Sequence, residues 1–146
     1  MYNTVLTLHS YWAYFTLFVL ALAVLNAISG YSARREYKLS KDFRLGLFAL
    51  IFSHIQLLLG LLLYFVSPKF ASWSEMGGEV MGNSLLRLLL VEHPVVNILA
   101  IVLITIGWSK HKKQTEDKQK FGKISLFYGL GLILFLSRIP YDLWFK

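Results

Sequence analysis

The chain contains no cysteine among its 146 residues. A protein without thiols forms no disulfide framework, cannot ligate an iron–sulfur cluster with its own side chains, and cannot attach haem through a Cys-x-x-Cys-His sequence. Any bound haem would therefore be non-covalent. Acidic residues are also scarce, since 8 Asp and Glu stand against 15 Lys and Arg, and the formal net charge is +7.

Apolar side chains, by contrast, are in excess. Hydrophobic residues make up 56% of the sequence and aromatic residues 16%, whereas ordinary soluble domains are ~45–50% apolar. The mean hydropathy is +0.56. We therefore expect an integral membrane protein in contact with the lipid bilayer. The basic residues fall in two loops between apolar segments, which is typical of membrane topology, so no nucleic-acid partner is expected.

Four apolar segments are long enough to cross the ~30 Å hydrocarbon core of a bilayer as helices. They cover about residues 5–29, 45–66, 84–108 and 124–144. The first is predicted to be a retained span rather than a signal peptide, because its basic residues follow it. The short connections predict an all-α, up-down-up-down four-helix bundle, one membrane domain in which spans one and three lie on a diagonal, as do spans two and four.

The two basic loops, residues 30–44 and 109–123, lie on the same side of the membrane under this threading. The positive-inside rule places both loops in the cytoplasm and both ends of the chain outside. His111, in the second basic loop, is predicted to be exposed to water. Aromatic residues near the two ends fit an outer interfacial belt: Tyr2, Tyr11, Trp12, Tyr141, Trp144 and Phe145.

Ionisable side chains inside the spans need an explanation, because an unpaired one in hydrocarbon costs at least ~2.5 kcal/mol. The third span carries Arg87, Glu92 and His93, followed by Pro94. An acid before it and a proline after it mark His93 as the first candidate for a specialised site.

Two further histidines lie in the spans. His9 lies near the outer end of the first span on a face of mostly small residues, and His54 lies nearer the middle of the second. Arg87 and Arg138 fall in the outer half of the third and fourth spans. His9 and His93 are therefore expected on diagonal helices in the same leaflet.

These residue types fit a b-type haem. Neutral imidazoles ligate iron, small residues leave room for a porphyrin, and guanidinium groups pair with propionates. We predict one or two non-covalent haems, with His93, His9 and His54 as candidate metal ligands and Arg87 and Arg138 as propionate partners. Each pairing of the three histidines stays open.

Structural interpretations stand beside this prediction. His9 could meet lipid headgroups, and His54 could hydrogen-bond a neighbouring helix as a purely structural residue. Glu92 could pair with Arg87, or with Arg138 across the bundle, and fix the register of the helices.

Five elements carry a resemblance to a known family: LHS (8–10), SHIQLLLGLLLYF (53–65), LVEHP (90–94), AIVLITIGWSK (100–110) and RIPYDLW (138–144). They resemble small four-span membrane proteins of Bacteroidota that are often labelled cytochrome b-like. The resemblance covers nearly the whole chain and implies a bacterial inner membrane. It includes the three membrane histidines and leaves out His111. The layout is also similar to half of a haem A synthase, whose four-helix halves hold haem between histidines.

Electron transfer by membrane-embedded haem is the function that these patterns favour. The alternative is a non-catalytic subunit of a larger membrane complex, and a third hypothesis is a proton conduit through Glu92, His54 and Arg138. The sequence has no nucleophile paired with a base, no phosphate loop and no HExxH motif, so no enzymatic reaction is predicted. A quinone, a partner complex and a second copy of the chain are the further partners left open.

Overall fold

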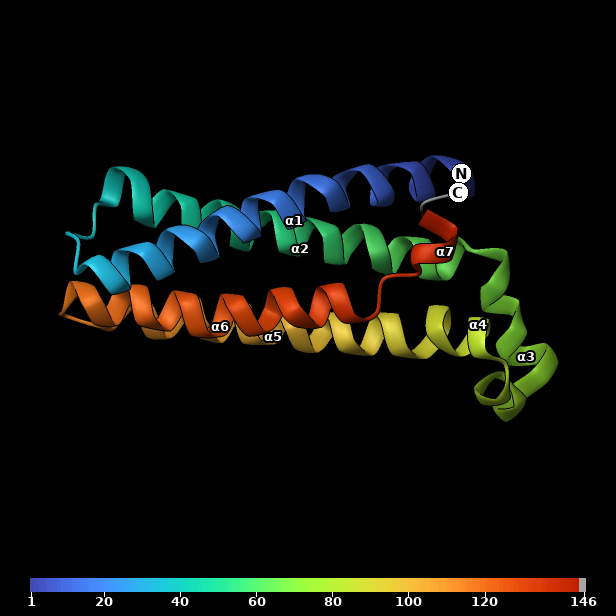
Figure 1. Ribbon diagram of the computed structural model, residues 1–146. Helices are drawn as coiled ribbons and strands as arrows, with labels where there is room; N and C mark the ends of the chain where they lie inside the picture. Colours follow the sequence, from blue (N-terminus) through green and yellow to red (C-terminus); the bar gives the residue numbers. More distant parts are fainter. Residues whose placement is uncertain (145–146) are drawn as a thin grey trace.

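The computed structural model describes residues 1–144, which form helices joined by short connections (Figure 1). Four long helical segments are apolar enough to cross a membrane, so the chain is a multi-pass membrane protein. They are α1 (Tyr2–Ala33), α2 (Arg44–Val66) with η1 (Leu39–Phe43) before it, α5 (His93–Lys112) with α4 (Ser84–Arg87) and η4 (Leu88–Glu92) before it, and α6 (Asp117–Ser137). Phe145, assigned to the interfacial belt above, lies outside the described residues.

The four segments pack as the predicted bundle. α1 contacts α2 and α6, and α5 also contacts α2 and α6. α1 and α5 therefore lie on one diagonal of the bundle and α2 and α6 on the other, which confirms the predicted arrangement. Large apolar side chains such as Phe15, Phe18 and Phe65 remain exposed on the outside, as expected for surfaces that face lipid.

Small residues let α5 and α6 approach closely. A Cβ added to Gly131 would lie 2.6 Å from Ile104 Cγ1, and one added to Gly107 would collide with Phe127 Cβ. Contacts of this kind are typical of membrane helix pairs, in which close backbone approach replaces the hydrophobic effect as the source of stability.

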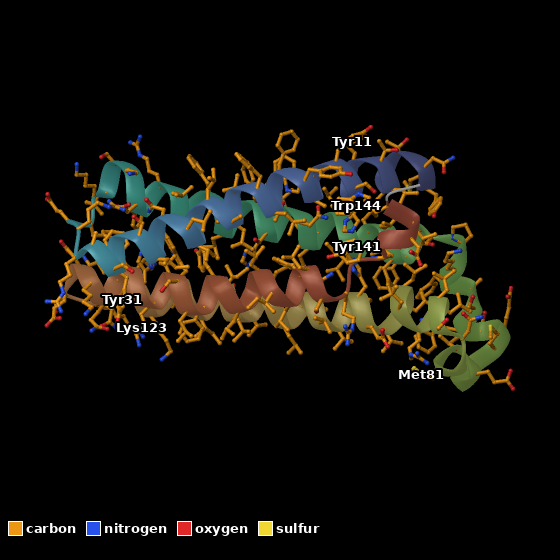
Figure 2. The ribbon with its side chains drawn as sticks, viewed as in Figure 1. Tyr11, Tyr31, Met81, Lys123, Tyr141 and Trp144 are labelled. Carbon is orange, nitrogen blue, oxygen red and sulfur yellow. The ribbon has the colours of Figure 1, made fainter. Side chains whose placement is uncertain are left out.

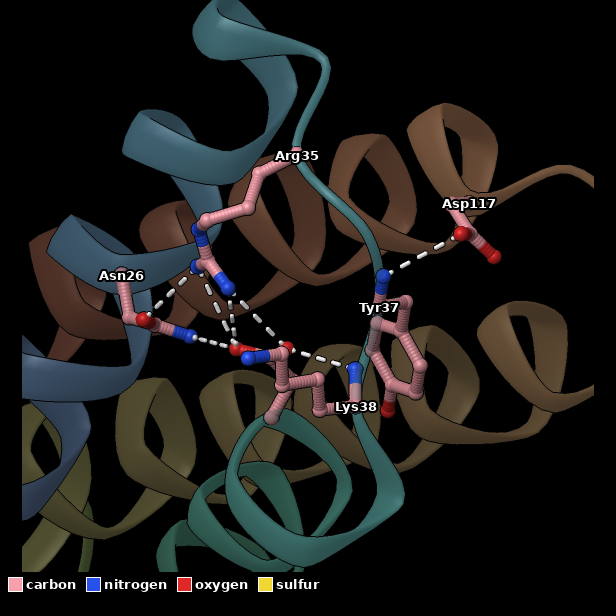
Figure 3. Close-up of polar contacts among 6 residues, drawn as sticks. Asn26, Arg35, Tyr37, Lys38 and Asp117 are labelled. Carbon is pink, nitrogen blue, oxygen red and sulfur yellow. Dashed lines mark hydrogen bonds and ion pairs between the residues drawn. The ribbon is translucent and has the colours of Figure 1, made fainter.

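One end of the bundle, here called the basic end, carries the loops at residues 34–38 and 113–116. Figure 3 shows its central polar network. The Asp42 carboxylate, whose side chain is 1% exposed, accepts hydrogen bonds from Asn26 Nδ2 at 2.7 Å, from the Lys38 backbone N–H at 2.8 Å, and from the Arg35 guanidinium at 3.2–3.3 Å. The Tyr37 backbone N–H donates to Asp117 and connects this network to α6.

The prediction that His111 is exposed to water is wrong. α5 continues to Lys112, so His111 lies on the helix, is 1% exposed, and packs against Tyr37, Phe43 and Trp108. Its Nδ1 donates to the Trp108 carbonyl at 2.7 Å, which leaves Nε2 to accept from the Tyr37 hydroxyl at 2.7 Å. Burial, together with the nearby Asp42 charge, raises the pKa of Tyr37, so this hydroxyl stays protonated.

At the opposite end, here called the cavity end, the fourth span ends earlier than the sequence predicts. The fourth span was predicted over about residues 124–144, whereas α6 covers Asp117–Ser137 and a short α7 (Tyr141–Trp144) follows. Pro140 explains the stop, because proline disfavours helix in the residue before it and cannot donate a backbone hydrogen bond. Figure 1 shows α7 lying beyond the end of α6 and close to α1.

The connection between the second and third long segments also lies at the cavity end. It consists of η2 (Pro68–Ala71), α3 (Ser72–Met76) and η3 (Gly77–Gly82), which project beyond the bundle (Figure 1). Gly77 has φ +57°, a conformation that favours glycine, and it ends α3.

Candidate functional site

A cavity of about 750 Å³ lies inside the cavity end. This volume is within the range of ~300–1,000 Å³ found for pockets that bury small molecules and cofactors. Its wall is mostly apolar, with polar side chains that include His9, Gln56, Tyr64, His93 and Asn97.

The cavity exists because α6 ends early. α1 begins at Tyr2 and the third segment at Ser84, whereas α6 ends at Ser137, so the fourth side of the bundle is incomplete here. α7 covers part of the gap and contributes Leu143 and Trp144 to the wall. The Trp144 ring stacks on Tyr14 of α1, with centroids 4.5 Å apart and planes at 24°. Figure 2 shows the labelled Trp144 near the part of α1 that carries Tyr11.

His9 of α1 and His93 of α5, from the diagonal pair of helices, meet edge to face on the wall of this cavity. Their ring centroids are 6.1 Å apart and their planes make an angle of 81°. Both rings line the cavity. The structure therefore brings together two of the three membrane histidines, at the same depth of the bundle.

The hydrogen bonds of His93 define which ring nitrogen is available. Nδ1 lies 2.8 Å from the backbone carbonyl of Arg138. A carbonyl only accepts, so Nδ1 carries the hydrogen and Nε2 carries the lone pair. Metal-ligating histidines commonly have this arrangement. The Asn97 amide nitrogen, one turn along α5, lies 3.1 Å from Nδ1 and 3.2 Å from Nε2, and because it can only donate, Nε2 is the ring nitrogen that accepts from it in this structure.

A wide helical turn places His93. The π-helical η4 ends at Glu92, and Pro94 follows His93. Because proline has no N–H, the Leu90 carbonyl four residues earlier loses its usual helical donor. Tyr64 of α2 replaces that donor, with its hydroxyl 2.9 Å from the Leu90 carbonyl, and itself accepts from Trp73 Nε1 at 2.9 Å. Single π-helical turns are frequent at functional sites.

Three buried side-chain atoms have no hydrogen-bond partner within residues 1–144: His9 Nδ1, Gln56 Oε1 and Asn97 Oδ1. All three residues line the cavity. Buried polar atoms are nearly always hydrogen-bonded in native proteins, so each exception needs an explanation. Their concentration around one cavity indicates a site that is completed by something besides the described side chains in their present positions.

His54 lies elsewhere. Its Nδ1 donates to the Leu50 carbonyl of its own helix at 2.8 Å, and its Nε2 is 3.5 Å from the Thr105 hydroxyl on α5. It does not line the cavity. The pairings of His54 with His9 and with His93 are therefore not brought together by the structure.

Glu92 forms ion pairs with both arginines that the sequence proposes as propionate partners. Arg87 Nε lies 2.9 Å from one carboxylate oxygen and Arg138 Nε lies 3.8 Å from the other. Arg87 also donates to the Met81 carbonyl at 2.8 Å. Neither arginine lines the cavity, whereas Lys69, which the sequence analysis missed, does. The only signal for Lys69 is its place directly after Ser67-Pro68, where the second span ends.

Among the described residues, no group of three or more His, Cys, Asp or Glu side chains could hold a metal ion. The donors that this chain offers at the cavity are therefore two imidazoles. Comparison of the chain with protein-family models, with curated proteins and with solved structures gives no match.

Proposed function

We propose that this protein binds one b-type haem in the cavity, that His9 and His93 are the residues that would hold it, and that the protein carries electrons within the membrane. The observation that supports this proposal is the pair of imidazoles from α1 and α5 that lie 6.1 Å apart, centroid to centroid, on the wall of a cavity of about 750 Å³. One haem is proposed because His54 has no place on the cavity wall.

The donor set fits haem better than a bare metal ion. A structural metal site made by protein alone usually needs about four ligands, and the cavity supplies two. Haem iron takes its remaining ligands from the porphyrin and needs only axial side chains. His9 and His93, whose ring centroids lie 6.1 Å apart, are the residues that would hold the iron of such a group.

The surroundings of the two rings also suit this group. The wall is mainly leucine, isoleucine and aromatic side chains, which exclude water and lower the local dielectric. Lys69 and Ser67 lie on the wall near the end of α2, where a cation and a hydroxyl can meet the carboxylates of the haem. Arg87 and Arg138 were expected in that role, but Glu92 already pairs with both of them.

A bound haem would supply one-electron redox chemistry, and the chain's own residues would ligate, orient and bury it. By the positive-inside rule, we place the basic end in the cytoplasm and the cavity end at the periplasmic side of a bacterial inner membrane. The haem would then lie in the outer half of the bilayer.

An absorption spectrum of the protein purified in detergent, recorded oxidised and then reduced, tests the proposal. We expect a Soret band that shifts on reduction. His9→Ala and His93→Ala should each abolish or strongly weaken the band, whereas His54→Ala, the matched control within the membrane, should keep it. A colourless protein after expression with ample haem, or equal loss in all three variants, would refute the proposal.

The second candidate function is a non-catalytic subunit of a larger membrane complex. The contacts that favour it are those that tie polar side chains to the scaffold, namely the Glu92 ion pairs and the bond from His93 to Arg138. This function predicts a colourless protein that co-purifies with a stable partner, and the same spectrum distinguishes the two.

A further inference from the structure

The two imidazoles of the cavity differ in how their Nδ1 atoms are held. His93 Nδ1 has a backbone acceptor, the Arg138 carbonyl at 2.8 Å. His9 Nδ1 is buried and has no partner among the residues that the structure describes. An imidazole whose Nδ1 has no hydrogen-bond partner can exchange between its two neutral tautomers. Nε2 then carries the lone pair in only one of the two tautomers.

The Cε1–Nδ1 edge of the His9 ring lies against Gly60 of α2. A Cβ added to Gly60 would lie 3.1 Å from His9 Cε1 and 3.6 Å from Nδ1, while His9 Nε2 is not among the atoms within 4 Å. The Nδ1 edge of the ring therefore faces α2, and Nε2 points away from it. Gly60 makes room for the ring because it has no side chain.

Gln56 lies one helical turn before Gly60, on the same face of α2. Its amide nitrogen donates to the His9 backbone carbonyl at 2.9 Å, so the side chain already contacts His9. Its amide oxygen is buried and has no partner within the described part of the chain. A ring nitrogen and an amide oxygen that both lack a partner among residues 1–144 thus come from two residues already in contact.

We propose that Gln56 is the positioning residue of His9. A small rotation lets its Oε1 accept the hydrogen of His9 Nδ1 while its Nε2 keeps the bond to the His9 carbonyl, so that one amide holds both the backbone and the ring. The hydrogen is then fixed on Nδ1, and the Nε2 lone pair faces the cavity. Gln56 and the Arg138 carbonyl are equivalent partners for the two opposing imidazoles.

The tautomer assignment stands on the contacts alone, whereas its effect on haem rests on the proposed function. An acceptor at Nδ1 makes imidazole a more basic ligand, which favours ferric over ferrous iron. Loss of the Gln56 acceptor should therefore raise the reduction potential of the haem. It should also weaken haem binding by about 10-fold, the lower limit for loss of such partners.

The first experiment uses the haem-free protein in detergent, labelled with ¹⁵N-histidine, with the His9 signals assigned by their loss in His9→Asn. We expect Nδ1 of His9 to be protonated and Nε2 unprotonated in the wild type and in Gln56→Glu, and a mixture of tautomers in Gln56→Leu. Gln119→Leu, the same change at an exposed position of α6, should leave His9 unchanged. A wild-type ring protonated at Nε2, or an unchanged tautomer in Gln56→Leu, overturns the proposal.

The second experiment compares the midpoint potentials of haem-loaded wild type, Gln56→Leu and Gln119→Leu. A higher potential in Gln56→Leu alone supports the positioning role, and an unchanged potential refutes it. A colourless wild type refutes the proposed function instead and leaves the tautomer experiment to decide on Gln56. If Gln56→Leu does not fold, the wild-type and Gln56→Glu spectra still decide, because each must show a protonated Nδ1.

Discussion

Asp42 should be the most sensitive acidic residue of this bundle. Its carboxylate, 1% exposed, is shared by Asn26 of α1, by Arg35 of the following loop, and by the Lys38 N–H that begins η1. Arg35 in turn lies over the Phe121 ring of α6, 4.9 Å from its centroid. Three of the four long segments therefore depend on this side chain.

The size of the effect follows from these contacts. Removing one partner of a buried ion pair costs ~3–5 kcal/mol, because the remaining charge is left unpaired. The Arg35 side chain is 28% exposed and keeps some water, so Asp42→Ala should lower the free energy of unfolding by about 3 kcal/mol. Asp42→Asn keeps the shape of the side chain and one acceptor oxygen, and it should lower the free energy of unfolding by ~1–3 kcal/mol.

Unfolding by sodium dodecyl sulfate in mixed micelles, followed by far-UV circular dichroism, measures these differences. Glu36→Ala is the matched control, since Glu36 is an exposed acid in the same loop, and it should change stability by less than ~0.5 kcal/mol. Equal stabilities of Asp42→Ala and Glu36→Ala would show that the buried network does not hold this end together.

Three further outcomes are expected. Gly107→Ala should cost ~1–3 kcal/mol through overpacking, whereas Gly129→Ala, whose added Cβ would meet nothing nearer than 3.9 Å, should be close to neutral in the same assay. Tyr64→Phe removes the donor to a buried carbonyl and should cost ~1–3 kcal/mol in unfolding free energy. Because the chain has no cysteine, Glu79→Cys should react with an impermeant maleimide in spheroplasts, and Lys113→Cys only after the membrane is opened; the reverse pattern would invert our orientation.

The architecture could be predicted from the sequence because hydrocarbon leaves a backbone few choices. Every N–H and C=O in a bilayer must be bonded within the protein, so a long apolar segment forms a helix, and short basic loops set the order of packing. The helix ends were harder to predict. The apolar residues around Pro140 extended the predicted fourth span to residue 144. A single proline changes the hydropathy of a whole segment very little, although it ends the helix locally.

The candidate site was predicted in part. The expectation that His9 and His93 lie on diagonal helices at similar depth holds, since it follows from helix order and position along the chain. The burial of His111 depends on tertiary contacts, whereas the pairing of Glu92 with Arg87 and Arg138 confirms the structural interpretation that the sequence offered. His111 is buried because α5 is one turn longer than predicted and meets Tyr37, and Arg87 is paired with Glu92 because η4 widens the turn between them.

The two ends of the bundle differ in how completely their buried polar groups are hydrogen-bonded. At the basic end, Asp42 and His111 have hydrogen bonds to both of their polar side-chain atoms. At the cavity end, His9, Gln56 and Asn97 each have one buried atom without a partner among residues 1–144. Such atoms are costly within a bilayer, where no water replaces the missing bond. The proposed bond from His9 to Gln56 satisfies two of these atoms. Asn97 Oδ1 remains, beside the His93 ring and on the wall of the same cavity, where a bound group can reach it.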